Sequence, residues 1–214
     1  MNKRNILITK QFIWIFLILL IGFGVRLIYL SGAIQNPDFS APLHDAEFKD
    51  YWARAILSGD YTPPRNEGNP FMEGHPLPNP PGYPLFLALI YWLTGGSYLA
   101  VRWVQICIGL LNIFLVYLLG KNLFDYRTGL FSALGVATYW AFVHYDMELN
   151  QLTIYITINL LCFNLLLQAH KKNNLRLLPF AGFVFGIGAW FRGEVFVLIF
   201  PLTVFVIFLS LIHI

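Results

Sequence analysis

Long apolar segments alternate with short polar segments along most of this chain. The first apolar segment, residues 11–30, is long enough to cross a bilayer, which takes about 20 residues. A cleaved signal peptide is the alternative for it, but the segment is longer than an ordinary signal h-region. Comparable segments follow at 97–120, 129–143, 152–167, 177–191 and from 195 onward. This pattern predicts an all-α polytopic membrane protein with about six transmembrane helices.

One polar segment, residues 31–82, interrupts this pattern and differs from it in composition. It contains most of the prolines and most of the acidic residues of the chain. Residues 44–57 lack Pro and Gly, which favours a helix with a partly apolar face lying on a membrane surface. The prolines from residue 63 to 81 predict an irregular loop. The apolar stretch 83–93 is too short to span and predicts an interfacial or re-entrant helix.

Composition supports a membrane protein and excludes several other classes. Hydrophobic residues make up 57% of the chain and charged residues 12%, whereas soluble domains average about 25% charged residues. The chain has no Gly-rich phosphate loop, no Cys/His metal spacing and no room for a doubly wound nucleotide-sugar domain. It also has no basic-aromatic stripe, so we expect no nucleic-acid partner.

The distribution of charge predicts the orientation of the protein. Short basic segments before the first span, around residues 121–127 and around 170–176 fall on one side of the predicted topology. The positive-inside rule places that side, with the N-terminus, in the cytoplasm. Every acidic residue except Asp125 then lies on the opposite side. We therefore expect a multi-pass protein of the cytoplasmic membrane whose polar chemistry is on the outer face.

The densest polar cluster, residues 44–54, is the first candidate for chemistry. It contains Asp45, Glu47 and Asp50 directly after the first span. Carboxylates near a membrane are costly unless they are solvated or paired, and they can act as general bases or bind divalent cations. On a helix, Asp45 and Lys49 are four residues apart and could pair. The alternative is an ordinary solvated surface helix.

A second acidic loop, residues 144–150, contains Asp146 and Glu148. Two carboxylates separated by one residue can hold a divalent metal ion, with His144 as a further candidate ligand. The alternative is a polar cap on a transmembrane turn, because this spacing is common by chance.

Arginines form the third group of candidates. Arg192 lies next to Glu194, and its fork of donors suits phosphate. A locally paired interfacial turn is the alternative. Arg26 and Arg102 raise the same question, and for them the alternative is snorkelling to the membrane surface.

Several short motifs occur in the order found in one enzyme class. Asp45-Ala46 and Trp52-Ala53 frame the first motif, and residues 57–61 read L-S-G-D-Y. Residues 81–91 then read P-G-Y-P-L-F-L-A-L-I-Y, and Glu148-Leu149 closes the second loop. This series resembles the polytopic glycosyltransferases of the GT-C class, in particular bacterial relatives of protein O-mannosyltransferases and aminoarabinose transferases. The resemblance covers nearly the whole chain.

The resemblance implies a polyprenyl-phosphate-linked sugar as donor and a hydroxyl group as acceptor. Asp45 would be the catalytic base, and Glu148 with Asp146 would bind a divalent metal or the donor phosphate. By their placement, Arg102 and Arg192 are candidates for binding the donor phosphate.

Other assignments and alternatives accompany this interpretation. Glu47 and Asp50 are further candidates for substrate or donor-phosphate binding. We expect residues 1–214 to be the N-terminal part of a single transmembrane glycosyltransferase domain, with outer loops at 31–82 and 144–150. Because relatives are longer and the chain stops inside an apolar run, we expect it to be truncated. The alternatives are a transporter or flippase for a lipid-linked substrate, or a non-catalytic membrane subunit.

Overall fold

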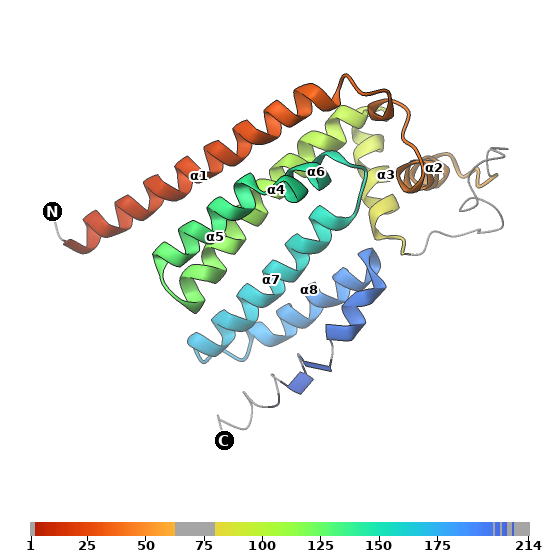
Figure 1. Ribbon diagram of the computed structural model, residues 1–214. Helices are drawn as coiled ribbons and strands as arrows, with labels where there is room; N and C mark the ends of the chain where they lie inside the picture. The colour runs from red at the N-terminus through yellow and green to blue at the C-terminus, as the bar shows by residue number, and fades with distance from the viewer. Residues whose placement is uncertain (1–2, 63–79, 199, 202, 205–206, 208–214) are drawn as a thin grey trace.

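The computed structural model describes residues 3–62 and 80–198, together with residues 200, 201, 203, 204 and 207. This part of the chain is helical and contains no strand, which confirms the predicted all-α class. Most of the predicted loop at 63–81 and the end of the last apolar run lie outside the described residues. The helices are α1 (Lys3–Ala33), α2 (Asp45–Ser58), α3 (Gly82–Thr94), α4 (Tyr98–Leu123), α5 (Tyr126–Thr138), α6 (Trp140–Met147), α7 (Leu152–Lys171) and α8 (Leu177–Phe191) (Figure 1).

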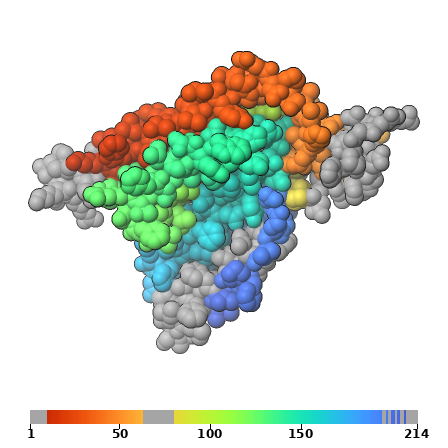
Figure 2. Space-filling model, viewed as in Figure 1, coloured from red at the N-terminus to blue at the C-terminus, as the bar shows by residue number. Residues whose placement is uncertain are grey.

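Helix α4 is the centre of the arrangement. It packs against α5 and α1 on one side and against α7 on the other, and α7 packs against α8. The short helices α2 and α3 pack against each other at one end of this bundle (Figure 1). Figure 2 shows α1 lying along the outside of the bundle. The bundle therefore carries both of these short helices at a single end.

Three of the described helices are long and apolar enough to cross a membrane: Lys10–Ala33 in α1, α4 and α7. Helix α8 is apolar but has only 15 residues, and α3 has 13. The short α3 agrees with the prediction that residues 83–93 form a helix that does not span. These apolar helices are those of a multi-pass membrane protein.

The span predicted at residues 129–143 is not one continuous helix, because the structure divides it into α5 and α6. The backbone is extended at Tyr139, with φ −69° and ψ 119°. The last carbonyls of a helix lack intrahelical partners, and Arg26 Nη1 donates to one of them, the Ala137 carbonyl, at 3.4 Å. Hydropathy registers only the apolar character of this segment, whereas the break accompanies a contact with a residue more than a hundred positions away.

Polar side chains join α4 to α7 inside the bundle. Asn112 Nδ2 donates to the Thr153 carbonyl at 3.1 Å, and Thr157 Oγ1 donates to Asn112 Oδ1 at 2.7 Å. Further along the same two helices, Asn164 Nδ2 of α7 donates to the Leu115 carbonyl of α4 at 3.2 Å. Such bonds between helices add to van der Waals packing where lipid offers no hydrogen-bond partners. They fix α4 against the helix that follows the second acidic loop.

Candidate active site

Segments from distant parts of the sequence meet at the end of the bundle that carries α2. The end of α1, residues 34–44, the start of α2, the start of α4 and the end of α6 enclose a cavity of about 630 Å³. A smaller cavity of about 170 Å³ lies between the start of α2 and the start of α3. Three of the residues predicted to carry chemistry line these two cavities: Asp45, Arg102 and Glu148.

A strained turn sets the position of the first helical residue of α2. His44 has φ 54° and ψ −121°, values that suit the second residue of a type II′ turn and normally favour glycine. The Ala46 amide donates to the Leu43 carbonyl at 3.2 Å, which closes the turn. A non-glycine residue in such a conformation is costly, and such strain clusters at functional sites. The turn brings Asp45 to the exposed first position of the helix.

Asp45 forms the predicted ion pair with Lys49, one helical turn further on. The Asp45 side chain is 66% exposed, whereas that of Lys49 is only 8% exposed. The Lys49 ammonium lies over the Tyr83 ring, 5.6 Å from its centroid. Both Asp45 and Lys49 line the smaller cavity, together with Tyr83 and Gln151. The Asp45 carboxylate is therefore accessible to an incoming group, whereas Lys49 is buried against the Tyr83 ring.

The electrostatics of Lys49 connect this pair to the rest of the site. Burial lowers the pKa of Lys49 below its usual range, and Asp45 partly offsets that effect. Arg192 lowers the same pKa and Glu148 raises it, both by smaller amounts. Lys49 thus lies within electrostatic reach of Asp45, Glu148 and Arg192. The first polar cluster, the second acidic loop and the Arg192 turn, which are far apart in the sequence, therefore act on the same side chain.

We expect Asp45→Asn to lower the pKa of Lys49 further. The substitution removes the main influence that raises this pKa and leaves the larger effect of burial unopposed. The pH midpoint for acylation of the Lys49 amine by a small reagent, followed by mass spectrometry, should therefore fall. Lys172, on the turn after α7, is the internal control and should be acylated to the same extent in both proteins. A midpoint for Lys49 that stays constant or rises would contradict the pairing.

The larger cavity contains the second group of predicted residues. Arg102 from α4 and Glu148 at the end of α6 both line it, and the Glu148 residue is exposed. His144 lines the same cavity, and its Nδ1 lies 2.8 Å from the Tyr29 hydroxyl of α1. His44 and Ala46 also line this cavity, whereas Asp45 lines the smaller one. The start of α2 therefore lies between the two cavities.

The first turns of α4 hold the second acidic loop in place. Arg102 Nε donates to the Met147 carbonyl at 3.1 Å, and its guanidinium stacks over the Phe39 ring with a centroid distance of 4.4 Å. Gln105 is fully buried, and its Nε2 donates to the Glu148 carbonyl at 2.7 Å. The Tyr83 hydroxyl donates to Gln105 Oε1 at 2.9 Å. Gln105 therefore orients the loop.

The role of Gln105 was not predicted from the sequence. A polar amide in an apolar run, three positions after Arg102, is a local signal that could have found it.

Asp146, which was predicted to bind a metal or the donor phosphate together with Glu148, is instead bound by two protein side chains. Its Oδ2 accepts a hydrogen bond from Arg26 Nε at 2.7 Å, and its Oδ1 accepts one from Thr153 Oγ1 at 2.8 Å. Asp146 and Arg26 are both buried, so Arg26 does not snorkel to a membrane surface. A side chain at Gly109 would collide with the Asp146 carboxylate, so α4 needs glycine at this contact.

These contacts do not fit a metal centre built on Asp146 and Glu148. Both oxygens of Asp146 already bind protein donors, and a metal site requires oxygens that are free to coordinate. Among the described residues, no group of three or more His, Cys, Asp or Glu could hold a metal ion. We therefore derive no reaction step through a metal.

Asp50 has both carboxylate oxygens bound by other helices rather than open to a ligand. The Tyr91 hydroxyl of α3 donates to Oδ1 at 2.7 Å, and the Tyr98 hydroxyl of α4 donates to Oδ2 at 3.0 Å. Arg54 Nε also donates to Oδ2, at 2.9 Å. Since these bonds tie α2 to α3 and α4, we assign Asp50 to positioning α2 in place of the predicted donor-phosphate contact. Glu47, on the same helix, is half-buried and lines neither cavity.

Arg192 follows the end of α8 and forms the predicted pair with Glu194. Its Nε and Nη2 donate to the two oxygens of Glu194, at 2.6 and 3.0 Å. The guanidinium lies over the Tyr155 ring, 5.8 Å from its centroid. This residue borders the site through its effect on Lys49, but it does not line the cavity that contains Arg102.

One known protein family matches the larger part of the chain. A family profile described as dolichyl-phosphate-mannose-protein mannosyltransferase matches residues 78–213. The match includes α3 through α8, and with them Arg102, Glu148 and Arg192. It begins after α2, so Asp45 lies outside it. No curated protein matches the chain.

Proposed function

The chain belongs to the dolichyl-phosphate-mannose-protein mannosyltransferase family and is a membrane glycosyltransferase of the GT-C type, and on this premise we propose its reaction. It transfers a sugar from a polyprenyl-phosphate donor to a hydroxyl acceptor, with inversion at the anomeric carbon. The reaction takes place at the end of the bundle that carries α2, on the outer face of the cytoplasmic membrane. The observation that carries this proposal is an exposed carboxylate, Asp45, beside a cavity lined by a buried arginine.

In this reaction Asp45 is the general base. Its carboxylate takes the proton from the acceptor hydroxyl while the hydroxyl oxygen forms a bond to the anomeric carbon of the sugar. The bond between that carbon and the phosphate oxygen breaks, and the polyprenyl phosphate leaves with the electron pair. Lys49 holds the Asp45 carboxylate in position through their ion pair. The exposure of Asp45 gives the acceptor access.

The leaving phosphate is stabilised by cations that the fold has already oriented. Arg102 uses two of its N–H groups on the Met147 and Tyr98 carbonyls within the described structure. A guanidinium has five N–H donors, so others remain for an anion in the larger cavity. Fixed donors of this kind act without reorganising during the reaction. Arg192 adds positive potential from the edge of the site.

Glu148 supports the sugar in this proposal. Its carboxylate is exposed in the cavity that Arg102 lines, and its backbone carbonyl is held by Gln105. Sugar hydroxyls donate to carboxylates in charge-assisted hydrogen bonds, which are stronger than neutral ones. The donor therefore lies with its phosphate toward Arg102 and its sugar toward Glu148 and Asp45.

A transfer assay with Glu148→Gln tests this arrangement. We expect the substitution to weaken donor binding by about tenfold, since a charged hydrogen bond contributes about 1.5–3 kcal/mol and the amide keeps part of it. The measurement is transfer of labelled sugar from the polyprenyl phosphate to a hydroxyl acceptor at varied donor concentration. Movement of the intact donor across the membrane without transfer would contradict the proposed activity.

Sugar-free polyprenyl phosphate provides the matched control. Its affinity should be unchanged in Glu148→Gln and reduced in Arg102→Gln, because only Arg102 is placed at the phosphate. Equal losses for both ligands in Glu148→Gln would remove the proposed sugar contact.

A further inference from the structure

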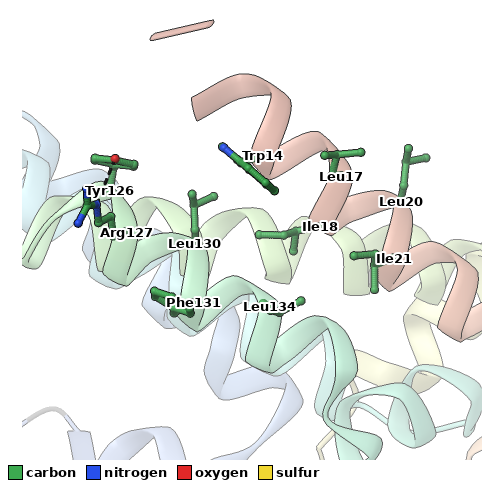
Figure 3. Close-up of a pocket in the computed structure, with 10 residues that line it drawn as sticks. All are labelled: Trp14, Leu17, Ile18, Leu20, Ile21, Tyr126, Arg127, Leu130, Phe131 and Leu134. Carbon is green, nitrogen blue, oxygen red and sulfur yellow. Dashed lines mark hydrogen bonds between the residues drawn. The ribbon is translucent and has the colours of Figure 1, made fainter. Parts of the chain in front are cut away.

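A long apolar groove lies between α1 and α5, away from the candidate active site. It has a volume of about 740 Å³. Figure 3 shows the residues that line it on the two neighbouring helices, with Arg127 and Tyr126 at one end. The apolar residues that line it are Trp14, Leu17, Ile18, Leu20, Ile21, Leu130, Phe131 and Leu134.

The length of the groove matches one leaflet of a bilayer. Along α5 it extends from Tyr126 to Leu134, and along α1 from Trp14 to Ile21. At 1.5 Å per residue this is roughly 12 Å, and one leaflet of the hydrocarbon core is about 15 Å deep. Phe131 is 75% exposed and Trp14 is 55% exposed, so the groove opens outward from the bundle. Its dimensions suit one acyl chain running parallel to the helices.

The polar end of the groove is basic. Arg127 is exposed there, and its Nε donates to the Tyr126 hydroxyl at 3.3 Å. Lys121 Nζ reaches the α1 residue Gln11, one turn before Trp14, at 2.9 Å. The nearest acidic residue along the chain, Asp125, caps α5 by accepting a hydrogen bond from the Thr128 amide at 2.8 Å. Asp125 acts on the Arg127 guanidinium only through space and forms no ion pair with it in the described part of the chain, so the exposed guanidinium can still contact an anion at the membrane surface.

We propose that this groove binds an anionic phospholipid of the leaflet nearest the N-terminus. One acyl chain lies between α1 and α5, and the phosphate-bearing headgroup lies against Arg127 and Tyr126. The complementarity has two parts: apolar depth for the chain and a cation at the headgroup level. A zwitterionic lipid with the same chains carries the same phosphate, but its headgroup cation offsets the attraction to Arg127, so the site distinguishes headgroups by their net charge.

Native mass spectrometry of the detergent-purified protein tests the proposal. The probes are phosphatidylglycerol and phosphatidylcholine with identical acyl chains. We expect phosphatidylglycerol to be retained about fivefold more, since one cation near an anionic lipid contributes an effect of that order. Added salt should reduce this preference through screening. Equal retention of the two lipids at low salt would overturn the proposal without any variant.

Two pairs of variants locate the site. Arg127→Gln should abolish the preference for phosphatidylglycerol, whereas Arg176→Gln, an exposed arginine on another turn, should keep it. Leu17→Trp should fill the groove and reduce retention of both lipids, whereas Phe16→Trp, exposed outside the groove, should not. Unchanged lipid retention in Arg127→Gln and Leu17→Trp would overturn the assignment. So would a dimer that only Leu17→Trp dissociates, because a second copy would then occupy the groove.

Discussion

Replacing Asp45 with Asn is expected to lower the rate of sugar transfer by about 10²- to 10⁴-fold, the contribution typical of a positioned general base. The amide has nearly the same shape but cannot accept the proton of the acceptor hydroxyl. Donor binding should change little, because Asp45 lines the smaller cavity and the phosphate is assigned to the larger one. Transfer rates and donor affinity, measured separately in the same membranes, check the prediction.

Asp60→Asn is the matched control for this experiment. Asp60 follows α2 in the same polar segment, and it accepts a hydrogen bond from the Thr62 amide at 2.9 Å without lining either cavity. Its substitution should leave transfer unchanged. If Asp45→Asn transfers sugar at the normal rate while inserted correctly, Asp45 is not the base, and a non-catalytic role for the α2 segment would follow.

Breaking the buried pair of Arg26 and Asp146 should destabilise the protein strongly. Either Arg26→Gln or Asp146→Asn leaves an uncompensated charge in the bundle, and losing one partner of such a pair costs about 3–5 kcal/mol. Thermal unfolding in detergent measures the loss. The pair also anchors α6, which ends directly before Glu148, so donor affinity should fall with stability.

A double substitution separates the pair from the charges that it contains. With Arg26→Leu and Asp146→Leu together no buried charge is left alone, so much of the lost stability should return. Arg176→Gln, at an exposed arginine, is the control and should change stability by less than about 0.5 kcal/mol. Single variants as stable as the unsubstituted protein would show that the pair contributes nothing to the fold.

Local sequence determined the elements of this protein wherever the signal lies within a few residues. Hydropathy located α1, α4 and α7 because each is a continuous apolar run of membrane length. Spacing predicted the pair of Asp45 and Lys49, because residues four apart on a helix face each other. The ordered motifs indicated the same glycosyltransferase class that the family match shows.

Tertiary structure decided which of the charged residues are open to a ligand. The sequence gives no reason to separate Asp45, Asp50 and Asp146. In the structure, Asp45 is exposed to solvent, Asp50 accepts hydrogen bonds from two tyrosines, and Asp146 pairs with a buried arginine. The break at Tyr139 was equally hidden, since it accompanies a hydrogen bond from Arg26 on another helix.

The physical reason is the range of the interactions. Propensity, hydropathy and helical spacing act between residues that are close in sequence, so the sequence alone determined the long helices α1, α4 and α7 and the first ion pair. Burial and hydrogen bonding of a carboxylate depend on side chains that are brought together only when the bundle packs. Arg26 and Asp146, separated by 120 positions, meet only in the folded protein. Their pairing takes Asp146 out of reach of a ligand, whereas Asp38, Asp45 and Glu148 keep exposed carboxylates at the two cavities.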